Sequence, residues 1–159
     1  MMNFSLVELL TRVMVFFLRA ESFYNAATNI DDLRINIDNY GGKSLHNQSH
    51  GESFLSLVQN RFRGNGFYIL DEPEAALSPM RQLTLLIEIN NLVKNNSQFI
   101  IATHSPILLA YPDAQIYNLD SGIERIEYAE TEQYKLTKNF LDNPNIFIER
   151  LFDSDFSTD

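Results

Sequence analysis

Two adjacent carboxylates, Asp71 and Glu72, follow directly on an apolar run at residues 67–70. Such a run is typical of a strand buried on both faces, which would bring both acids to one edge of a sheet. One carboxylate suits Mg²⁺, which takes few protein ligands and keeps waters and phosphate oxygens. The other suits a water that attacks a phosphoryl group. We predict Asp71 as a magnesium ligand and Glu72 as the base; the alternative is a strand ending in two solvated acids.

A second polar group follows the next apolar run along the chain. Residues 98–103 predict another buried strand, and His104, Ser105 and Pro106 end it. Ligands of parallel α/β sheets bind beyond the carboxyl ends of the strands. The polar residues of both runs therefore stand where such a sheet would bind a ligand. The alternative for His104 is a polar residue that caps the turn at Ser105 and Pro106.

A third candidate is the start of a helix predicted at residues 52–62, which residues 49–53 (Ser-His-Gly-Glu-Ser) introduce. The first turn of a helix offers N–H groups and the positive end of the helix dipole to a phosphate. The alternative is that Ser49 is a simple helix cap.

The elements that must position these residues alternate between strand and helix in the middle of the chain, which predicts a parallel α/β sheet with helices on its faces. Ser78 and Pro79 carry the signature of a helix start. We expect helices at 1–20 (amphipathic), 22–38, 52–62, 79–93, 106–110, 131–141 and 144–152, and strands at 67–70, 98–103, 115–119 and 123–128, the last two paired as a hairpin.

Composition narrows the class of protein. The 159 residues are 45% hydrophobic, and 12 Lys and Arg against 21 Asp and Glu give a net charge of −9. This predicts one globular domain at 1–152 with a disordered tail at 153–159, and it argues against a surface that coats nucleic acid. The absence of cysteine excludes disulfides, thiolate zinc sites and cysteine nucleophiles. No export signal or membrane segment is recognisable, so a cytoplasmic location is expected.

Taken together and in order, these segments resemble the C-terminal portion of an ABC-type P-loop ATPase, and more specifically the RecF/SMC-like AAA-family ATPases. Residues 67–72 resemble Walker B, residues 72–79 resemble Walker B running into a D-loop, and residues 102–106 resemble the H-loop. The signature motif is matched at Ser49 and Gly51, whereas His50 and Glu52 depart from its usual pattern. The D-loop residues are Ala76, Leu77 and Ser78.

The resemblance implies an N-terminally incomplete, P-loop NTPase-like parallel sheet core with flanking helices, and ATP and Mg²⁺ as cofactors. Asp71 would bind Mg²⁺, Glu72 would activate water, and His104 would sense the γ-phosphate. Ser49, His50, Gly51 and Glu52 would contact ATP held by an opposing subunit.

The phosphate-binding motif G-x-x-x-x-G-K-[ST] does not occur in the sequence. Gly42, Lys43 and Ser44 imitate its end, but Ile37 stands at the first glycine and a helix precedes the segment. Turnover would then need a Walker A-bearing lobe or partner. The expected protein partner is a second copy of the chain in a homodimer or a Walker A-bearing protein, and the sheet would expose an apolar edge. The alternatives are a catalytically inactive, truncated relative acting as an interaction subunit and, by family analogy alone, a nucleic-acid-binding module.

Overall fold

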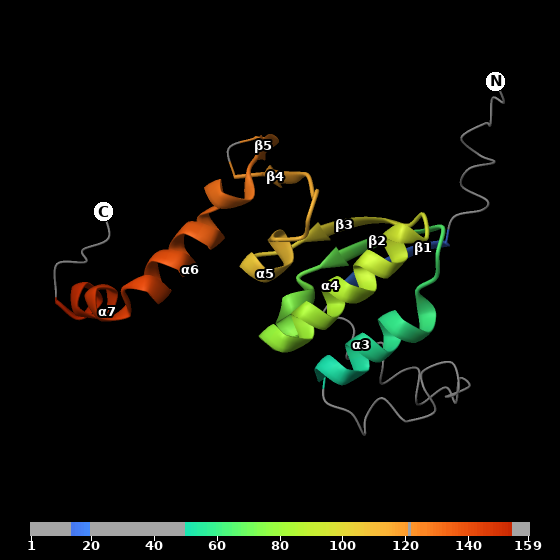
Figure 1. The fold of residues 1–159 in the computed structure, drawn as a ribbon, viewed down its shortest axis with the longest axis horizontal. Coiled ribbons are helices and arrows are strands. Elements are labelled where there is room, and N and C mark those ends of the chain that lie inside the picture. Colours follow the sequence, from blue (N-terminus) through green and yellow to red (C-terminus); the bar gives the residue numbers. More distant parts are fainter. Residues whose placement is uncertain (1–13, 20–49, 121, 154–159) are drawn as a thin grey trace. The chain divides into compact units, whose positions relative to one another are not determined.

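The computed structural model describes residues 14–19, 50–120 and 122–153 and divides the chain into two compact units, Met1–Leu108 and Leu109–Asp159 (Figure 1). In the first unit lie β1 (Met14–Arg19), α3 (His50–Arg61), β2 (Gly66–Asp71), the 3₁₀ helix η3 (Pro73–Ala76), α4 (Pro79–Lys94) and β3 (Gln98–Ala102). Helix α5 (Pro106–Leu109) leads into the second, which holds β4 (Ile116–Asn118), β5 (Glu124–Ile126), η4 (Tyr128–Glu130), α6 (Glu132–Asp142) and α7 (Pro144–Phe152).

The first unit is built on a parallel sheet in the order β1-β2-β3, as the alternating pattern predicts. Side chains alternate between its two faces. One face carries Tyr68 and Leu70, both with no exposed surface, and the ring of Tyr68 stacks on Phe62 at 4.1 Å and on Phe99 at 4.9 Å. Aromatic and aliphatic burial on this face therefore anchors the strand that ends in Asp71.

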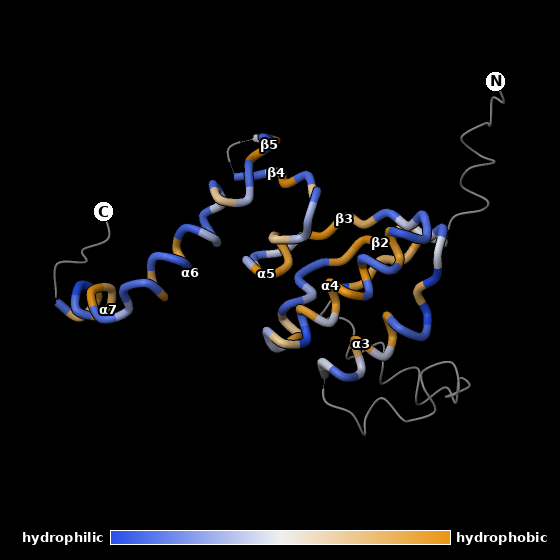
Figure 2. The backbone as a smooth tube through the Cα atoms, in the orientation of Figure 1, coloured by the Kyte–Doolittle hydropathy of each residue, from blue (hydrophilic) through white to orange (hydrophobic). Residues whose placement is uncertain are grey.

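The opposite face of the sheet is more open than the sequence indicates. Val15, Phe17 and Ile100 are 56%, 65% and 53% exposed. The predicted burial is therefore wrong for this face of β3, whereas Phe67 and Ile69 of β2 are half-buried there. Figure 2 shows how hydrophobic β2 and β3 are. An apolar run alone does not reveal how far each face of a strand is buried.

Helices α3 and α4 form the layer that packs with the sheet. Phe54 and Val58 of α3 are buried, as are Leu85 and Ile89 of α4. Helix α4 begins as predicted, with Ser78 at the N-cap position and proline in the first turn, and it contacts both α3 and β3. The predicted helix 52–62 is confirmed with an earlier start at His50.

The first strand corrects the sequence interpretation. The sequence predicts an amphipathic helix at residues 1–20, but Met14–Arg19 is a strand that pairs in parallel with β2, from Met14 opposite Gly66 to Arg19 opposite Asp71. The adjacent residues Val15 to Leu18 are all bulky and apolar, a composition that suits a strand. The leucines before residue 14 recur at helical spacing, so the sequence pattern favours a continued helix where the strand begins.

The second unit holds the predicted hairpin and two helices. Strands β4 and β5 pair antiparallel in a sheet of their own. Helix α6 is capped by Thr131, whose hydroxyl accepts a hydrogen bond from the Tyr134 N–H at 3.3 Å. Large apolar side chains of α6 and α7 are exposed, including Leu141 at 68% and Phe152 at 81%. The predictions for 22–38, Gly42 to Ser44, Ser49 and most of the tail lie outside the described residues.

Candidate functional site

The chain turns sharply at the carboxyl end of β2. Asp71 is the last residue of the strand, and Glu72 follows with φ 46° and ψ 51°, in the left-handed region. The Glu72 N–H donates to the Ala102 carbonyl at 2.9 Å, which ties the turn to the end of β3. A glutamate in this region stores strain, and stored strain of this kind is concentrated at functional sites.

Asp71 already has a cationic partner. Its Oδ2 lies 3.2 Å from Nε of Arg19, the residue opposite it on β1, and the two side chains are 33% and 50% exposed. An ion pair this exposed to water contributes about 0 to 1 kcal/mol. A divalent cation at Asp71 would therefore face a weak competitor.

Glu72 and His104 come together across the ends of β2 and β3. Glu72 Oε1 lies 3.7 Å from His104 Nε2, and the two side chains are 46% and 77% exposed. Both are open to solvent and thus accessible to a ligand. The structure brings the predicted base and the predicted phosphate-sensing histidine to one sheet edge, next to Asp71.

The backbone that carries His104 is held from η3. Glu74 Oε1 accepts a hydrogen bond from the His104 N–H at 2.6 Å, and Glu74 Oε2 accepts one from the Thr103 hydroxyl at 2.7 Å. The Thr103 hydroxyl accepts in turn from the Ser105 N–H at 3.0 Å. Sequence reasoning missed Glu74 as a site residue, since nothing in the spacing of residues 71–74 reveals a contact with residues 29 and 30 positions later.

Ser105 continues this polar chain into the core. Its hydroxyl donates to Gln82 Oε1 at 2.5 Å and accepts from the Ile107 N–H at 3.1 Å, which caps α5. The Gln82 side chain donates to the Leu77 carbonyl at 3.1 Å. Ser105 and Gln82 are both buried, so their hydrogen bonds satisfy groups that water cannot reach. The network links η3, β3, α4 and α5 behind the exposed carboxylates.

The predicted signature and D-loop segments also lie against each other. A Cβ on Gly51 would meet the Ala76 carbonyl oxygen at 2.8 Å and Cδ of Arg81 at the same distance, so glycine permits this close packing. Arg81 pairs with Glu52 at 3.0 Å. Leu77 is buried and Ser78 is exposed at the start of α4. His50 begins α3.

The donor set at the sheet edge fits magnesium in part. Among the described residues, no cluster of three or more His, Cys, Asp or Glu side chains could hold a metal ion by itself. Asp71 offers hard oxygen ligands at an accessible edge, and Mg²⁺ is commonly held by one or two carboxylates with phosphate oxygens and waters. The residues therefore suit Mg²⁺ delivered with a nucleotide rather than an all-protein metal cage.

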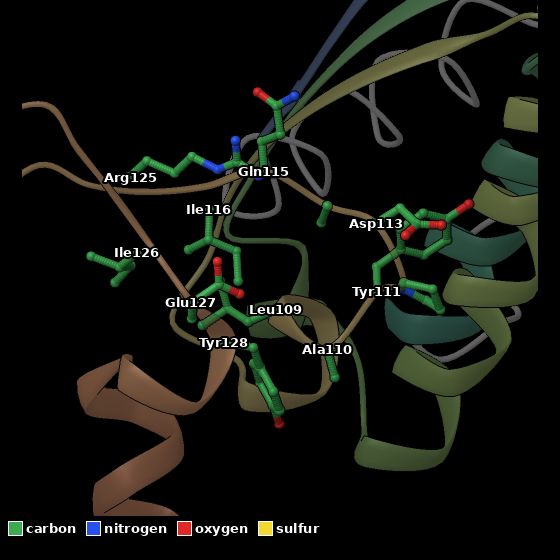
Figure 3. Close-up of a pocket in the computed structure, with 12 residues that line it drawn as sticks. Leu109, Ala110, Tyr111, Asp113, Gln115, Ile116, Arg125, Ile126, Glu127 and Tyr128 are labelled. Atoms are coloured by element: carbon green, nitrogen blue, oxygen red, sulfur yellow. The ribbon is translucent and has the colours of Figure 1, made fainter.

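A pocket on the described surface lies in the second unit. It is an open, polar depression formed by the segment after α5 and by the β4–β5 hairpin, with Asp113, Arg125 and Glu127 among its walls (Figure 3). Burial, and to a lesser extent the nearby Tyr134, raises the pKa of Tyr128 in this lining above its ordinary 10.0. None of the residues that the sequence singles out lies in it, so the pocket does not support the predicted chemistry.

Comparison with known proteins agrees with the α/β architecture. None of the described helices is long and apolar enough to span a membrane. No solved structure matches the chain. Residues 23–110, more than half of the chain, match the family described as "AAA domain, putative AbiEii toxin, Type IV TA system". This range contains β2, β3 and the sheet edge with Asp71, Glu72 and His104. The chain therefore belongs to this AAA-domain family, with a P-loop NTPase-like fold class and a nucleotide-binding, ATPase-like function.

Proposed function

We propose that the carboxyl end of β2 and β3 is the metal and water half of a Mg-ATP site in an ABC-type, RecF/SMC-like ATPase. The observation that carries the proposal is the convergence of three side chains, Asp71, Glu72 and His104, at one sheet edge, with Glu72 Oε1 3.7 Å from His104 Nε2. Parallel α/β sheets bind their ligands at this edge. The strained backbone of Glu72 supports the proposal.

Each of these residues has a distinct part in hydrolysis. Asp71 would hold Mg²⁺, which would neutralise charge on the phosphates. Glu72 would accept a proton from a water whose oxygen attacks the γ-phosphorus. The bond from that phosphorus to the β,γ-bridging oxygen breaks, its electron pair leaves with ADP, and inorganic phosphate forms. His104, exposed beside Glu72, donates a hydrogen bond to a γ-phosphate oxygen.

The proposed site is completed from outside the described residues. Because the sequence contains no G-x-x-x-x-G-K-[ST], the phosphate-wrapping loop comes from a further lobe or from a partner protein that carries this motif. The start of α3 at His50, Gly51 and Glu52 lies next to Ala76 of the D-loop segment. We assign this surface, with Ser49, to ATP held by the opposing subunit.

The experiment is a calorimetric titration of Mg-ATP into the chain carrying Glu72→Gln, which removes the base and prevents turnover. We expect weak but saturable binding at millimolar nucleotide that EDTA abolishes, because the metal half of the site contacts the Mg²⁺-bound phosphates even without the phosphate-wrapping loop. Adding Asp71→Asn should weaken binding by at least about tenfold, because it removes the metal ligand. Asp113→Asn is the matched control: asparagine tolerates its left-handed backbone (φ 62°), and binding should not change.

A lack of binding in the Glu72→Gln chain, or equal effects of Asp71→Asn and Asp113→Asn, would contradict the proposal. The first result would favour the second candidate function, an inactive relative that acts as an interaction subunit. The observation in favour of that candidate is the missing phosphate-binding motif.

A further inference from the structure

The carboxylate of Glu74 accepts hydrogen bonds from two consecutive residues that lie far away in the sequence. Oε2 accepts from the Thr103 hydroxyl at 2.7 Å, and Oε1 accepts from the His104 N–H at 2.6 Å. Hydrogen bonds to an ionised acceptor are short and about twice as strong as neutral ones. Together they hold the chain at the point where β3 ends and the backbone of His104 begins.

The same contacts argue against a role of Glu74 in binding metal or water. Both of its oxygens are occupied by donors, and the side chain is half-buried. Asp71 and Glu72, by contrast, present carboxylates that are 33% and 46% exposed and have cationic or ionisable partners. Glu74 is thus built to hold protein, whereas its two acidic neighbours are open to a ligand.

Hydrogen bonds to Ser105 and α4 hold the same segment from its other side. The Thr103 hydroxyl, which donates to Glu74, accepts from the Ser105 N–H at 3.0 Å, and the buried Ser105 hydroxyl donates to Gln82 of α4 at 2.5 Å. Residues 103–105 are therefore held by hydrogen bonds to η3 on one side and to α4 on the other. With its backbone held in this way, the His104 side chain is directed toward Glu72, 3.7 Å away.

We infer that Glu74 is a positioning residue: its carboxylate fixes the backbone at Thr103 and His104 and so holds the His104 imidazole opposite Glu72. The functional meaning of this contact rests on the proposed role of His104 at the γ-phosphate, whereas the contact itself does not. A geometric test without nucleotide can therefore fail or succeed independently of ATP binding.

The test uses nuclear magnetic resonance on the full chain without nucleotide. Two signals are followed: hydrogen exchange of the His104 amide, and the Cε1–H signal of the His104 ring, assigned with His104→Gln. Glu72→Gln changes the chemical shift of this ring signal, and the size of that displacement reports how closely the His104 ring and the residue 72 side chain are held together. It is measured with glutamate, glutamine and alanine at position 74.

Glu74→Ala should raise the exchange rate of the His104 amide by roughly tenfold or more, because a charge-assisted hydrogen bond is lost. It should also reduce the displacement of the ring signal by at least half. Glu74→Gln should restore both readouts toward the parent, since its amide can still accept from the His104 N–H and donate to the Thr103 hydroxyl. A merely structural role would not predict that the ring responds to Glu72 through residue 74.

Glu88→Ala is the control, because Glu88 is another glutamate of this unit and accepts a hydrogen bond from the Gln59 side chain at 2.8 Å. It should leave both His104 readouts unchanged. The inference is wrong if Glu74→Ala behaves like Glu88→Ala. It is also wrong if Glu74→Gln fails to restore the ring displacement that Glu74→Ala removes.

Discussion

The chain adopts a left-handed backbone conformation at both ends of β2, but with a different type of residue at each end. Before the strand, Asn65 turns the chain with φ 57°, and after it Glu72 does so with φ 46°. Asparagine is enriched in the left-handed region, whereas glutamate is not. The amino end thus uses a residue suited to the turn, and the carboxyl end uses one that is suited to chemistry.

The polar contacts of the two ends differ in the same way. At the amino end, the buried Tyr68 hydroxyl donates to the Arg63 carbonyl and accepts from the Arg63 N–H, both at 2.7 Å, and Ser97 donates to the same carbonyl at 3.1 Å. At the carboxyl end, Asp71 and Glu72 meet exposed side chains. Closed contacts to the backbone stabilise a fold, while open carboxylates can exchange their partners for a ligand.

The largest effect on stability should come from the amino end. Tyr68→Phe keeps the stacked ring but leaves the Arg63 N–H and one acceptor site without this partner, which should lower the free energy of unfolding by about 1 to 2 kcal/mol. Urea denaturation measures the change. Tyr117→Phe removes a hydroxyl from an exposed ring and should cost almost nothing; equal losses in both variants would remove the distinction between the two ends.

Glycine substitutions at the two turns test whether the backbone is strained at one end of β2 and relaxed at the other. Glu72→Gly relieves a left-handed glutamate and should raise the free energy of unfolding by about 0.5 to 1 kcal/mol, after the entropy cost of glycine. Asn65→Gly should change it by less than about 0.5 kcal/mol, because asparagine already tolerates this conformation. If thermal or urea unfolding shows that Glu72→Gly destabilises the chain more than Asn65→Gly, Glu72 is not strained.

The smallest stability effect is expected at the Arg19–Asp71 pair. Arg19→Gln should alter the free energy of unfolding by less than about 0.5 kcal/mol, because both side chains are substantially exposed. The same change should tighten Mn²⁺ binding at Asp71, since it removes a competing cation. Calorimetry with Mn²⁺-ATP in the Glu72→Gln chain checks the second effect, and weaker binding after Arg19→Gln would show that the arginine supports the metal site.

The sequence predicts much of the first unit because local signals and tertiary context agree there. The apolar run before Asp71 and the Ser78-Pro79 helix start both appear where expected. The prediction fails at β1, where an apolar segment following a helical pattern becomes a strand because it pairs with β2. The pairing of β1 with a distant segment determines that it is a strand, and the local periodicity of the sequence carries no information about this pairing.

The candidate site was predictable in its acids and its histidine but not in its supports. Asp71, Glu72 and His104 stand out because polar residues end apolar runs. Arg19 becomes recognisable when β1 is known to lie in register with β2, and Glu74 when η3 is seen to reach the end of β3. Residues that act through contacts across the fold leave no local signature.

The most direct test of the difference between the two ends is paramagnetic broadening of backbone amide signals by Mn²⁺-ATP in the Glu72→Gln chain. The six residues of β2 separate its ends by about 17 Å, at roughly 3.3 Å per residue, far enough for the steeply distance-dependent broadening to tell them apart. We predict that the amides of Thr103 and His104 broaden while those of Arg63 and Ser97 stay sharp. Broadening at the amino end, or none at the carboxyl end at millimolar Mn²⁺-ATP, would contradict the account.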